Sequence, residues 1–211
     1  MDKKTYNSIL NHYTALYHIH GDHPGSLGWP KGKQKIRFKV MSEIGDLNNS
    51  SILDVGCGFG DFLNFLQTKK LKTDYFGIDI NPIFIKIAKE KFPNGNFQTF
   101  DIQKTKMKKH FDWVFAIGIT NKCGSYKYIE EMLYAMFKIS KYGIAMDFLS
   151  SYVDFKGKGD FHSSPDKIFK IAKKISKRAV IRHDYLPYQF SVYIYKNDKI
   201  NKDGMFSDWV D

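Results

Sequence analysis

Cysteine is scarce in this sequence, and long apolar runs are missing altogether. Cys57 and Cys123 are the two cysteines among 211 residues, and no CxxC pair occurs. A disulfide framework or a structural zinc site needs more thiols at closer spacing. We therefore expect two free thiols and no bound metal. No stretch approaches the roughly 20 apolar residues that a membrane-spanning helix requires.

Signals for export, linkers and repeats are also missing. The first residues, MDKKTYNSIL, lack the apolar segment of a secretion signal. We expect a cytoplasmic protein that makes no membrane contact. Without a low-complexity linker or an internal repeat, 211 residues predict a single domain with one sizeable core. The oligomeric state does not follow from the sequence.

Positive charge is what the sequence has in excess. Lysine and arginine number 33 against 22 acidic residues, a formal net charge of +11. Such an excess favours a phosphate-bearing partner if it is gathered on one surface. The lysines are spread along the chain, with modest clusters at residues 69–72, 104–109 and 167–177. Solvated helix faces are the ordinary interpretation, and a nucleic-acid surface is the alternative.

Hydrophobic periodicity predicts strands that mostly alternate with helices. The predicted strands are 51–55, 75–80, 96–100, 111–117, 142–149, 179–183 and 189–195. Two of the helices between them begin with an N-cap residue and a proline, Asn81-Pro82 and Ser164-Pro165. Crossover helices are typical of parallel neighbours, whereas no helix separates the last two strands. We expect one α/β domain with a mostly parallel seven-stranded sheet, an antiparallel closing hairpin and helices on both faces.

The core is expected over residues 34–196, followed by a tail over 197–211. Before it lie an amphipathic helix, with apolar residues at 6, 9, 10, 13, 16 and 17, and a segment from His18 to Lys33. That segment holds four glycines and two prolines, so we expect a long loop. Loops of this length are often functional, and its position suits a lid. His18, His20 and His23 in it are candidate general bases near neutral pH.

The stretch ILDVGCGFG, residues 52–60, is the part of the sequence that most clearly indicates a ligand-binding site. A buried strand runs into Gly56, Gly58 and Gly60 at alternate positions and then into a helix. Glycine is needed where the backbone turns tightly or where a ligand lies against the main chain. A nicotinamide-type turn reads GxGxxG and presents a helix N-terminus to a pyrophosphate. This turn reads GxGxG and follows Asp54, a carboxylate that suits an ammonium group better than an anion.

These residues resemble the first motif of the class I S-adenosylmethionine-dependent methyltransferases. The resemblance covers residues 34–149 and, more loosely, the closing strands. It implies a Rossmann-like methyltransferase with S-adenosyl-L-methionine as cofactor. In that family the acid ending the second strand binds the ribose hydroxyls, here Asp79, and the next residue, Ile80, lies against the adenine. The acid and the amide after the third strand read the adenine, here Asp101 and Ile102.

Two residues of the helix before the first strand complete this expected site. Gln34 and Arg37 share a helix face. Their placement is similar to the Gln-x-x-Lys of cyclopropane synthases, and Arg37 is expected to bind the cofactor's carboxylate, with a surface arginine as the alternative. Each aspartate could also cap a turn, but three acids in the family's order favour binding. The expected cofactor contacts are Gln34, Arg37, Asp54, Gly56, Cys57, Gly58, Gly60, Asp79, Ile80, Asp101, Ile102 and Ile117.

The acceptor side of the sequence is less explicit. The fourth strand ends in FAIGIT, not in the Asp/Asn-Pro-Pro-Tyr of enzymes that act on adenine, cytosine or glutamine amides. We expect methylation of an O or N nucleophile on a small metabolite or sugar-type acceptor. RNA is the alternative, and a non-catalytic cofactor-binding protein is a third interpretation. Candidate catalytic residues are His18, His20, His23, His183 and Tyr185.

Overall fold

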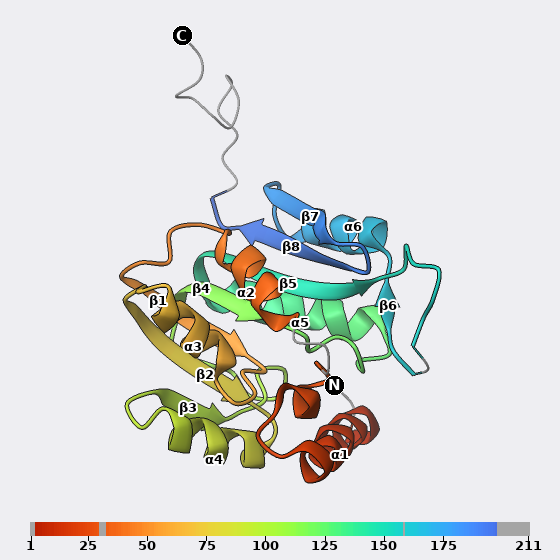
Figure 1. The fold of residues 1–211 in the computed structure, drawn as a ribbon. Coiled ribbons are helices and arrows are strands. Elements are labelled where there is room, and N and C mark those ends of the chain that lie inside the picture. Colours follow the sequence, from red (N-terminus) through yellow and green to blue (C-terminus); the bar gives the residue numbers. More distant parts are fainter. Residues whose placement is uncertain (1–2, 30–32, 158, 198–211) are drawn as a thin grey trace.

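A continuous eight-stranded sheet forms the centre of the molecule (Figure 1). The computed structural model describes residues 3–29, 33–157 and 159–197. Seven strands follow the order β3-β2-β1-β4-β5-β8-β7, and a short β6 pairs with β5 outside this path. The strands are β1 (Ser50–Val55), β2 (Thr73–Asp79), β3 (Asn96–Thr99), β4 (Phe111–Ala116), β5 (Ser140–Ser150), β6 (His162–Ser163), β7 (Ala179–Leu186) and β8 (Gln189–Tyr195).

The pairing confirms the predicted topology. Neighbouring strands in the series β3, β2, β1, β4 and β5 pair in parallel, and β8 runs antiparallel to both β5 and β7. The prediction missed β6, whose two residues are too few to give a periodic signal. Strand β7 also continues beyond the predicted residue 183 to Leu186, across a register shift between Arg182 and Leu186.

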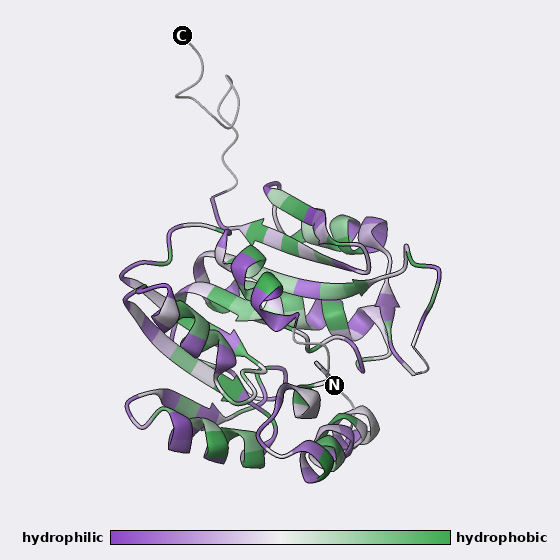
Figure 2. Ribbon diagram, viewed as in Figure 1, coloured by the Kyte–Doolittle hydropathy of each residue, from purple (hydrophilic) through white to green (hydrophobic). Residues whose placement is uncertain are grey.

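Helices cover both faces of the sheet, as predicted. They are α2 (Gln34–Ser42), α3 (Asp61–Thr68), α4 (Pro82–Lys91), α5 (Tyr126–Ile139) and α6 (Pro165–Ile175). The two predicted N-caps are present, because Asn81 accepts from the Ile83 amide at 3.0 Å and Ser164 from the Lys167 amide at 3.4 Å. In Figure 2 the helices carry both apolar and polar residues, as expected of elements buried on one side.

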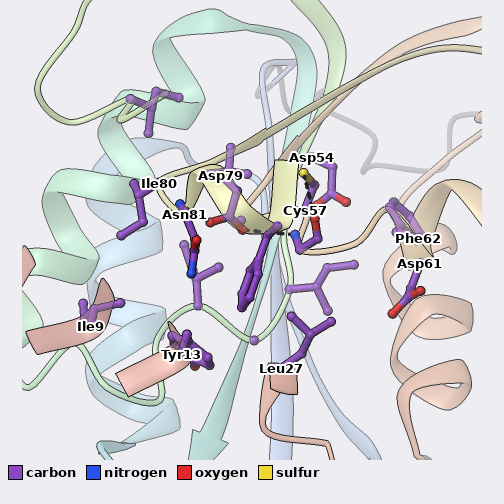
Figure 3. A pocket seen from close by; sticks show the side chains of 18 of the residues that line it. Ile9, Tyr13, Leu27, Asp54, Cys57, Asp61, Phe62, Asp79, Ile80 and Asn81 are labelled. Carbon is purple, nitrogen blue, oxygen red and sulfur yellow. Dashed lines mark hydrogen bonds between the residues drawn. The ribbon is translucent and has the colours of Figure 1, made fainter. Parts of the chain in front are cut away.

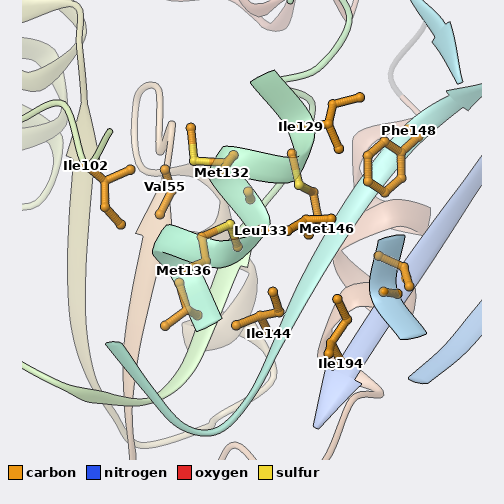
Figure 4. Close-up of a cluster of buried hydrophobic side chains, with 14 of the residues drawn as sticks. Val55, Ile102, Ile129, Met132, Leu133, Met136, Ile144, Met146, Phe148 and Ile194 are labelled. Carbon is orange, nitrogen blue, oxygen red and sulfur yellow. The ribbon is translucent and has the colours of Figure 1, made fainter. Parts of the chain in front are cut away.

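Each face of the sheet has its own apolar core. One core joins α5 and α6 to the central strands, with Ile129, Met136 and Ile168 fully buried (Figure 4). The other joins α2 and α3 to the opposite face, where the rings of Phe38 and Phe115 both contact Phe62. The two cores fix the sheet between its helices, so the loops at the strand ends are held in place.

The N-terminal segment is more regular than predicted. Helix α1 (Lys3–His20) includes His18 and His20, and it ends at Gly21, whose φ of 64° suits glycine. A 3₁₀-helix, η1 (Pro24–Leu27), follows, with Pro24 at its start. The expectation of a continuous loop was therefore wrong for these two stretches. The glycines and prolines there act as signals for the end and the start of a helix.

Neither a membrane span nor a metal cluster is found in the part of the chain that the structure describes. None of the described helices is long and apolar enough to cross a bilayer. No group of three or more His, Cys, Asp or Glu side chains that could hold a metal occurs among residues 3–29, 33–157 and 159–197. Cys57 and Cys123 are both buried free thiols. The tail predicted from residue 197 lies outside the described residues from residue 198 onward.

Candidate functional site

A cavity of about 120 Å³ lies where the parallel strands β1 to β4 end (Figure 3). Parallel strands place their C-terminal ends at one edge of a sheet, so the loops that follow them converge there. Three residues of α1, namely Ile9, Leu10 and Tyr13, and Leu27 of η1 also line the cavity. The N-terminal helices therefore lie over the site that the strand ends build.

The glycine turn after β1 forms one wall of the cavity. Gly56 has a φ of 75° and Gly58 a φ of 55°, a left-handed region that residues with a Cβ rarely adopt. The amides of Gly56 and Cys57 donate to the carbonyl of Ile78 at 2.7 and 3.0 Å, which ties the turn to β2. A Cβ on Gly58 would lie 2.9 Å from the Leu27 side chain. The turn thus presents bare backbone to the cavity.

Asp79 joins two of these loops at the end of β2. One of its carboxylate oxygens accepts from the Gly58 amide at 3.0 Å, and the other accepts from the Asn81 amide at 2.8 Å. Burial raises the pKa of Asp79 to about 6, although these backbone hydrogen bonds act in the opposite direction. The carboxylate therefore sits at the centre of the site in an environment that lacks a compensating cation.

Asp54 is buried more deeply, within β1. It is 2% exposed, and the Tyr75 hydroxyl donates to one of its oxygens at 2.6 Å. Burial raises the pKa of Asp54 to about 7 in spite of that hydrogen bond. A cation placed beside Asp54 would favour its ionised form.

Asp101 offers an unused hydrogen-bond acceptor after β3. One oxygen accepts from the Gln103 amide at 2.9 Å and so closes a turn. The other oxygen is buried and has no hydrogen-bond partner among the described residues, although the Lys104 ammonium lies 3.7 Å away. A ligand that donates an N–H here would satisfy it.

The lining of this cavity carries negative charge alone. Asp54, Asp61, Asp79 and Asp101 line it, and its described lining includes no lysine, arginine or histidine. Lysines outside the lining pair with two of them, Lys91 with Asp61 at 3.6 Å and Lys104 with Asp101 at 3.7 Å. Asp54 and Asp79 have no ion pair among the described residues, and a wall of this kind opposes a phosphate-bearing ligand and favours a cationic one. The cavity is acidic even though the chain as a whole is basic.

The structure brings most of the predicted cofactor residues to this cavity. The ten that line it are Gln34, Asp54, Gly56, Cys57, Gly58, Asp79, Ile80, Asp101, Ile102 and Ile117. Gly60 does not, because it is the N-cap of α3 and its α-carbon faces the rings of Phe92 and Phe97. Arg37 does not line it either, and belongs to the lining of a second cavity.

This second cavity, of about 890 Å³, lies beside the first. Its walls come from α1, η1, the segment between β5 and β6, and the turn between β7 and β8. Tyr13 and Trp29 line both cavities, so they form the boundary between them. The lining of the second cavity includes Lys33, Arg37 and Lys122 together with Asp154 and Asp160, so it carries both signs of charge, unlike the first.

The five predicted catalytic candidates have different positions. His20 lines the second cavity, whereas His18, His23, His183 and Tyr185 line neither. His23 caps η1, since its Nδ1 accepts from the Gly25 amide at 3.0 Å. The Tyr185 hydroxyl is 2.8 Å from that of Ser191.

Several lining residues were missed by the sequence interpretation. Asp61, in the first turn of α3, is 3.3 Å from the amide nitrogen of Gln34 that donates to it. Its place directly after the glycine turn was a usable signal. His12 and His162 line the second cavity, but their positions in the sequence give no sign of this. The apolar residues of α1 were identified, but periodicity does not say what a helix packs on.

Comparison with known proteins agrees with this geometry. Residues 52–143 match the family model described as a methyltransferase domain. The Mycobacterium tuberculosis protein Rv1506c, named as a methyltransferase, is 30% identical over 158 residues, which is 69% of this chain and 93% of that protein. The span that the family model matches includes the glycine turn and strands β2 to β4.

Solved structures share the fold at low sequence identity. The magnesium protoporphyrin IX methyltransferase ChlM from Synechocystis PCC 6803 with bound SAM aligns over 92% of this chain and 97% of its own, with a TM-score of 0.67 and 14% identity. The complex of DhpI with SAM and HEP aligns over 92% and 98%, with a TM-score of 0.69 and 11% identity. The fold is that of a Rossmann-like methyltransferase. The chain belongs to the class I S-adenosylmethionine-dependent methyltransferases.

Proposed function

We propose that this enzyme binds S-adenosylmethionine in the first cavity and transfers its methyl group to an oxygen or nitrogen of a small-molecule acceptor. The observation that carries the proposal is the lining of that cavity, with four aspartates and no basic residue in its described part around a glycine turn. S-adenosylmethionine carries a sulfonium and an ammonium group. An acidic wall is complementary to both.

Different residues of the lining contact different parts of the cofactor. Asp79 keeps lone pairs beyond its two backbone hydrogen bonds, and a carboxylate with spare lone pairs can accept from ribose hydroxyls. Asp101 has a free oxygen that suits the amino group of adenine. Asp54 and Gln34 provide polar groups for the amino acid end. Gly56 and Gly58 let the cofactor lie against the backbone.

Little covalent chemistry is required of the chain. The bound cofactor supplies a methyl group already activated by the positive charge on sulfur, and direct displacement leaves S-adenosylhomocysteine. The protein aligns the two reactants and excludes water. Tyr13, Leu27 and Trp29 line the cavity, and their apolar groups would keep water from the bound cofactor. A general base is needed only for a nucleophile that retains its proton, and His20 is the predicted candidate that lines the second cavity.

A small acceptor suits the space next to the cofactor cavity. The second cavity, at about 890 Å³, is within the range of about 300–1,000 Å³ usual for small-molecule sites. The lysine clusters that raised the RNA alternative, at residues 69–72, 104–109 and 167–177, contribute nothing to the described lining of either cavity. This arrangement supports a metabolite or a sugar over RNA.

Calorimetric titration tests the proposal. S-adenosylmethionine and S-adenosylhomocysteine should both bind, whereas NAD, which carries a pyrophosphate, should not. A folded protein that binds neither sulfur compound contradicts the proposal. A salt series with RNA separates the two acceptor classes, because RNA affinity falls steeply with ionic strength and the affinity of a small acceptor much less.

A further inference from the structure

The second cavity is adjacent to the cofactor cavity at the point where a transferred methyl group must cross. Tyr13 and Trp29 line both spaces, so the two cavities meet at these rings. An acceptor in the second cavity would reach the cofactor across this boundary. The chemistry of the second cavity therefore bears on what the enzyme methylates.

Arg37 is the residue of the second cavity whose hydrogen bonding is least complete. The side chain is 1% exposed. Its Nε donates to the amide oxygen of Gln189, which also lines the cavity. Its Nη1 lies 3.4 Å from a carboxylate oxygen of Asp147, yet Nη1 and Nη2 have no hydrogen-bond partner among the described residues. Buried donors of this kind are rare unless a ligand completes them.

Trp29 holds the guanidinium in a defined orientation. The centre of its ring is 3.4 Å from the Arg37 Cζ, so the indole covers one face of the guanidinium plane. Trp29 also packs against Gly118, where a side chain would collide with the indole. Stacking on a face leaves the N–H edge for hydrogen bonds. Such an edge matches the two oxygens of a carboxylate or a phosphate.

The other charged side chains that line the second cavity are Lys33, Lys122, Asp154 and Asp160, and among the described contacts none of them forms an ion pair with Arg37. Lys122 is paired with Asp160 at 2.6 Å, and both line the cavity. The Lys33 ammonium lies 5.3 Å from the centre of the Tyr188 ring. Asp147, which is not part of the cavity lining, is the buried ion-pair partner of Arg37: its Oδ2 faces Nη1 at 3.4 Å, and its Oδ1 accepts from the Gly118 amide at 2.6 Å. Arg37 therefore has one anionic neighbour, but its Nη2 has no hydrogen-bond partner among the described residues, and an oxyanion from outside the protein would supply one.

We propose that the second cavity binds the methyl acceptor and that Arg37 binds an oxyanion of that acceptor. The substrate class is a small molecule that carries a carboxylate or a phosphate beside its nucleophile. The inference rests on the proposed function. It assigns Arg37 to the acceptor, whereas the sequence predicted a contact with the cofactor's carboxylate.

Binding of matched probes tests this assignment. Benzoate and its neutral analogue benzamide are titrated into protein saturated with S-adenosylhomocysteine, and phenyl phosphate distinguishes a phosphate site from a carboxylate site. The expected result is that one anion binds about tenfold or more tightly than benzamide, as a charge-assisted pair provides. Equal affinities, or no binding of any probe, would overturn the proposal. This comparison uses the unmodified protein and is repeated without S-adenosylhomocysteine.

Variants of Arg37 then test whether this residue causes the preference for the anion over benzamide. Arg37→Gln should abolish the preference for the anion and leave the affinity for S-adenosylhomocysteine within about twofold, and Arg37→Lys should retain part of the preference. Arg182→Gln is the control, because Arg182 pairs with Glu43 and Asp184 and lines neither cavity. If Arg37→Gln does not fold, Arg37→Lys alone must still weaken the preference. A preference that persists, or a loss confined to S-adenosylhomocysteine, overturns the assignment. Failure of the unmodified protein to bind S-adenosylhomocysteine contradicts the proposed function instead.

Discussion

Tyr75 and Asp54 form a hydrogen-bonded pair inside the sheet, with the hydroxyl of Tyr75 donating to the carboxylate at 2.6 Å. The bond lowers the pKa of Asp54, which burial raises to about 7. Tyr75→Phe should therefore move the pKa of Asp54 further up. At pH 7 a smaller fraction of Asp54 is then ionised, and affinity for S-adenosylmethionine should fall about tenfold.

The control for this variant removes a tyrosine hydroxyl elsewhere. Tyr195→Phe deletes the hydroxyl that donates to the carbonyl of Ile44 at 3.0 Å, outside the cofactor cavity. Titration calorimetry at pH 7 and pH 8.5 compares the two. The Tyr75→Phe defect should shrink at the higher pH and Tyr195→Phe should have none. A defect of equal size at both pH values contradicts a role through ionisation.

The unmodified enzyme should bind its cofactor more tightly as pH rises from 5.5 to 7.5. Burial raises the pKa of Asp79 to about 6 and that of Asp54 to about 7, so both carboxyls gain charge across this range. A cationic ligand favours the ionised forms, and one linked proton changes affinity about tenfold per pH unit below the pKa. Titration in two buffers of different ionisation enthalpy should show proton release at pH 6.

The same two groups affect folding in the opposite direction. Their pKa values in the folded protein exceed those of exposed carboxyls, so the stability they contribute is present at low pH and is lost as pH rises through about 6 to 7. Thermal unfolding without ligand should show this loss, and saturating S-adenosylmethionine should reduce it. Constant affinity for S-adenosylmethionine between pH 5.5 and 7.5 would contradict the prediction on cofactor binding, and would mean that the ionisation of neither carboxyl affects the bound cofactor.

The sequence was most informative where backbone chemistry is local. The glycine turn, the acids at strand ends and the N-caps at Asn81 and Ser164 each depend on a few adjacent residues, and the parallel and antiparallel pairing followed from where crossover helices occur. The order of the strands in the sheet was not predicted. Contacts between distant segments were not predictable. Nothing in the periodicity of α1 indicates that Tyr13 and Asp79 line the same cavity, and the spacing of Gln34 and Arg37 does not reveal that they line different cavities.

Asp79→Ala should cost about 1.5–3 kcal/mol of cofactor affinity, the usual value of a charge-assisted hydrogen-bonded contact. The measurement is titration calorimetry with S-adenosylmethionine and S-adenosylhomocysteine, after thermal unfolding shows that the variant is folded. Asp74→Ala is the matched control on the same strand, because Asp74 is exposed and pairs with Lys109 outside the cavity. Normal affinity in a folded Asp79→Ala variant would rule out the ribose assignment.

Gly58→Val should abolish detectable cofactor binding while most of the sheet remains folded. Its φ of 55° strains any branched residue, and its α-carbon faces both the cavity and Leu27. Gly124→Val isolates the backbone strain, since Gly124 has a φ of 68° with open space around it. Adding Leu27→Ala to Gly58→Val makes room for the valine. Binding restored by that second change would mean that the cofactor does not lie against Gly58.

The N-terminal helices should open to admit the cofactor and close over it. The first cavity, at about 120 Å³, is smaller than the range of about 300–1,000 Å³ usual for small-molecule sites, and Leu27 lies against Gly58 in its wall. We therefore expect entry of the cofactor to require a movement of α1 and η1 away from the strand ends. Hydrogen exchange measured by mass spectrometry should show faster exchange in residues 3–29 than in α5 without ligand, and increased protection with S-adenosylhomocysteine. Helix α6 is the internal reference, because it lines neither cavity and its exchange should not change.

Three histidine variants test the same helices. His20→Ala should lower turnover of a confirmed acceptor, His23→Ala should speed exchange in η1 by removing its cap, and His18→Ala should do neither. Exchange in residues 3–29 that ignores the ligand, together with normal turnover in all three variants, would show that these helices are a fixed wall.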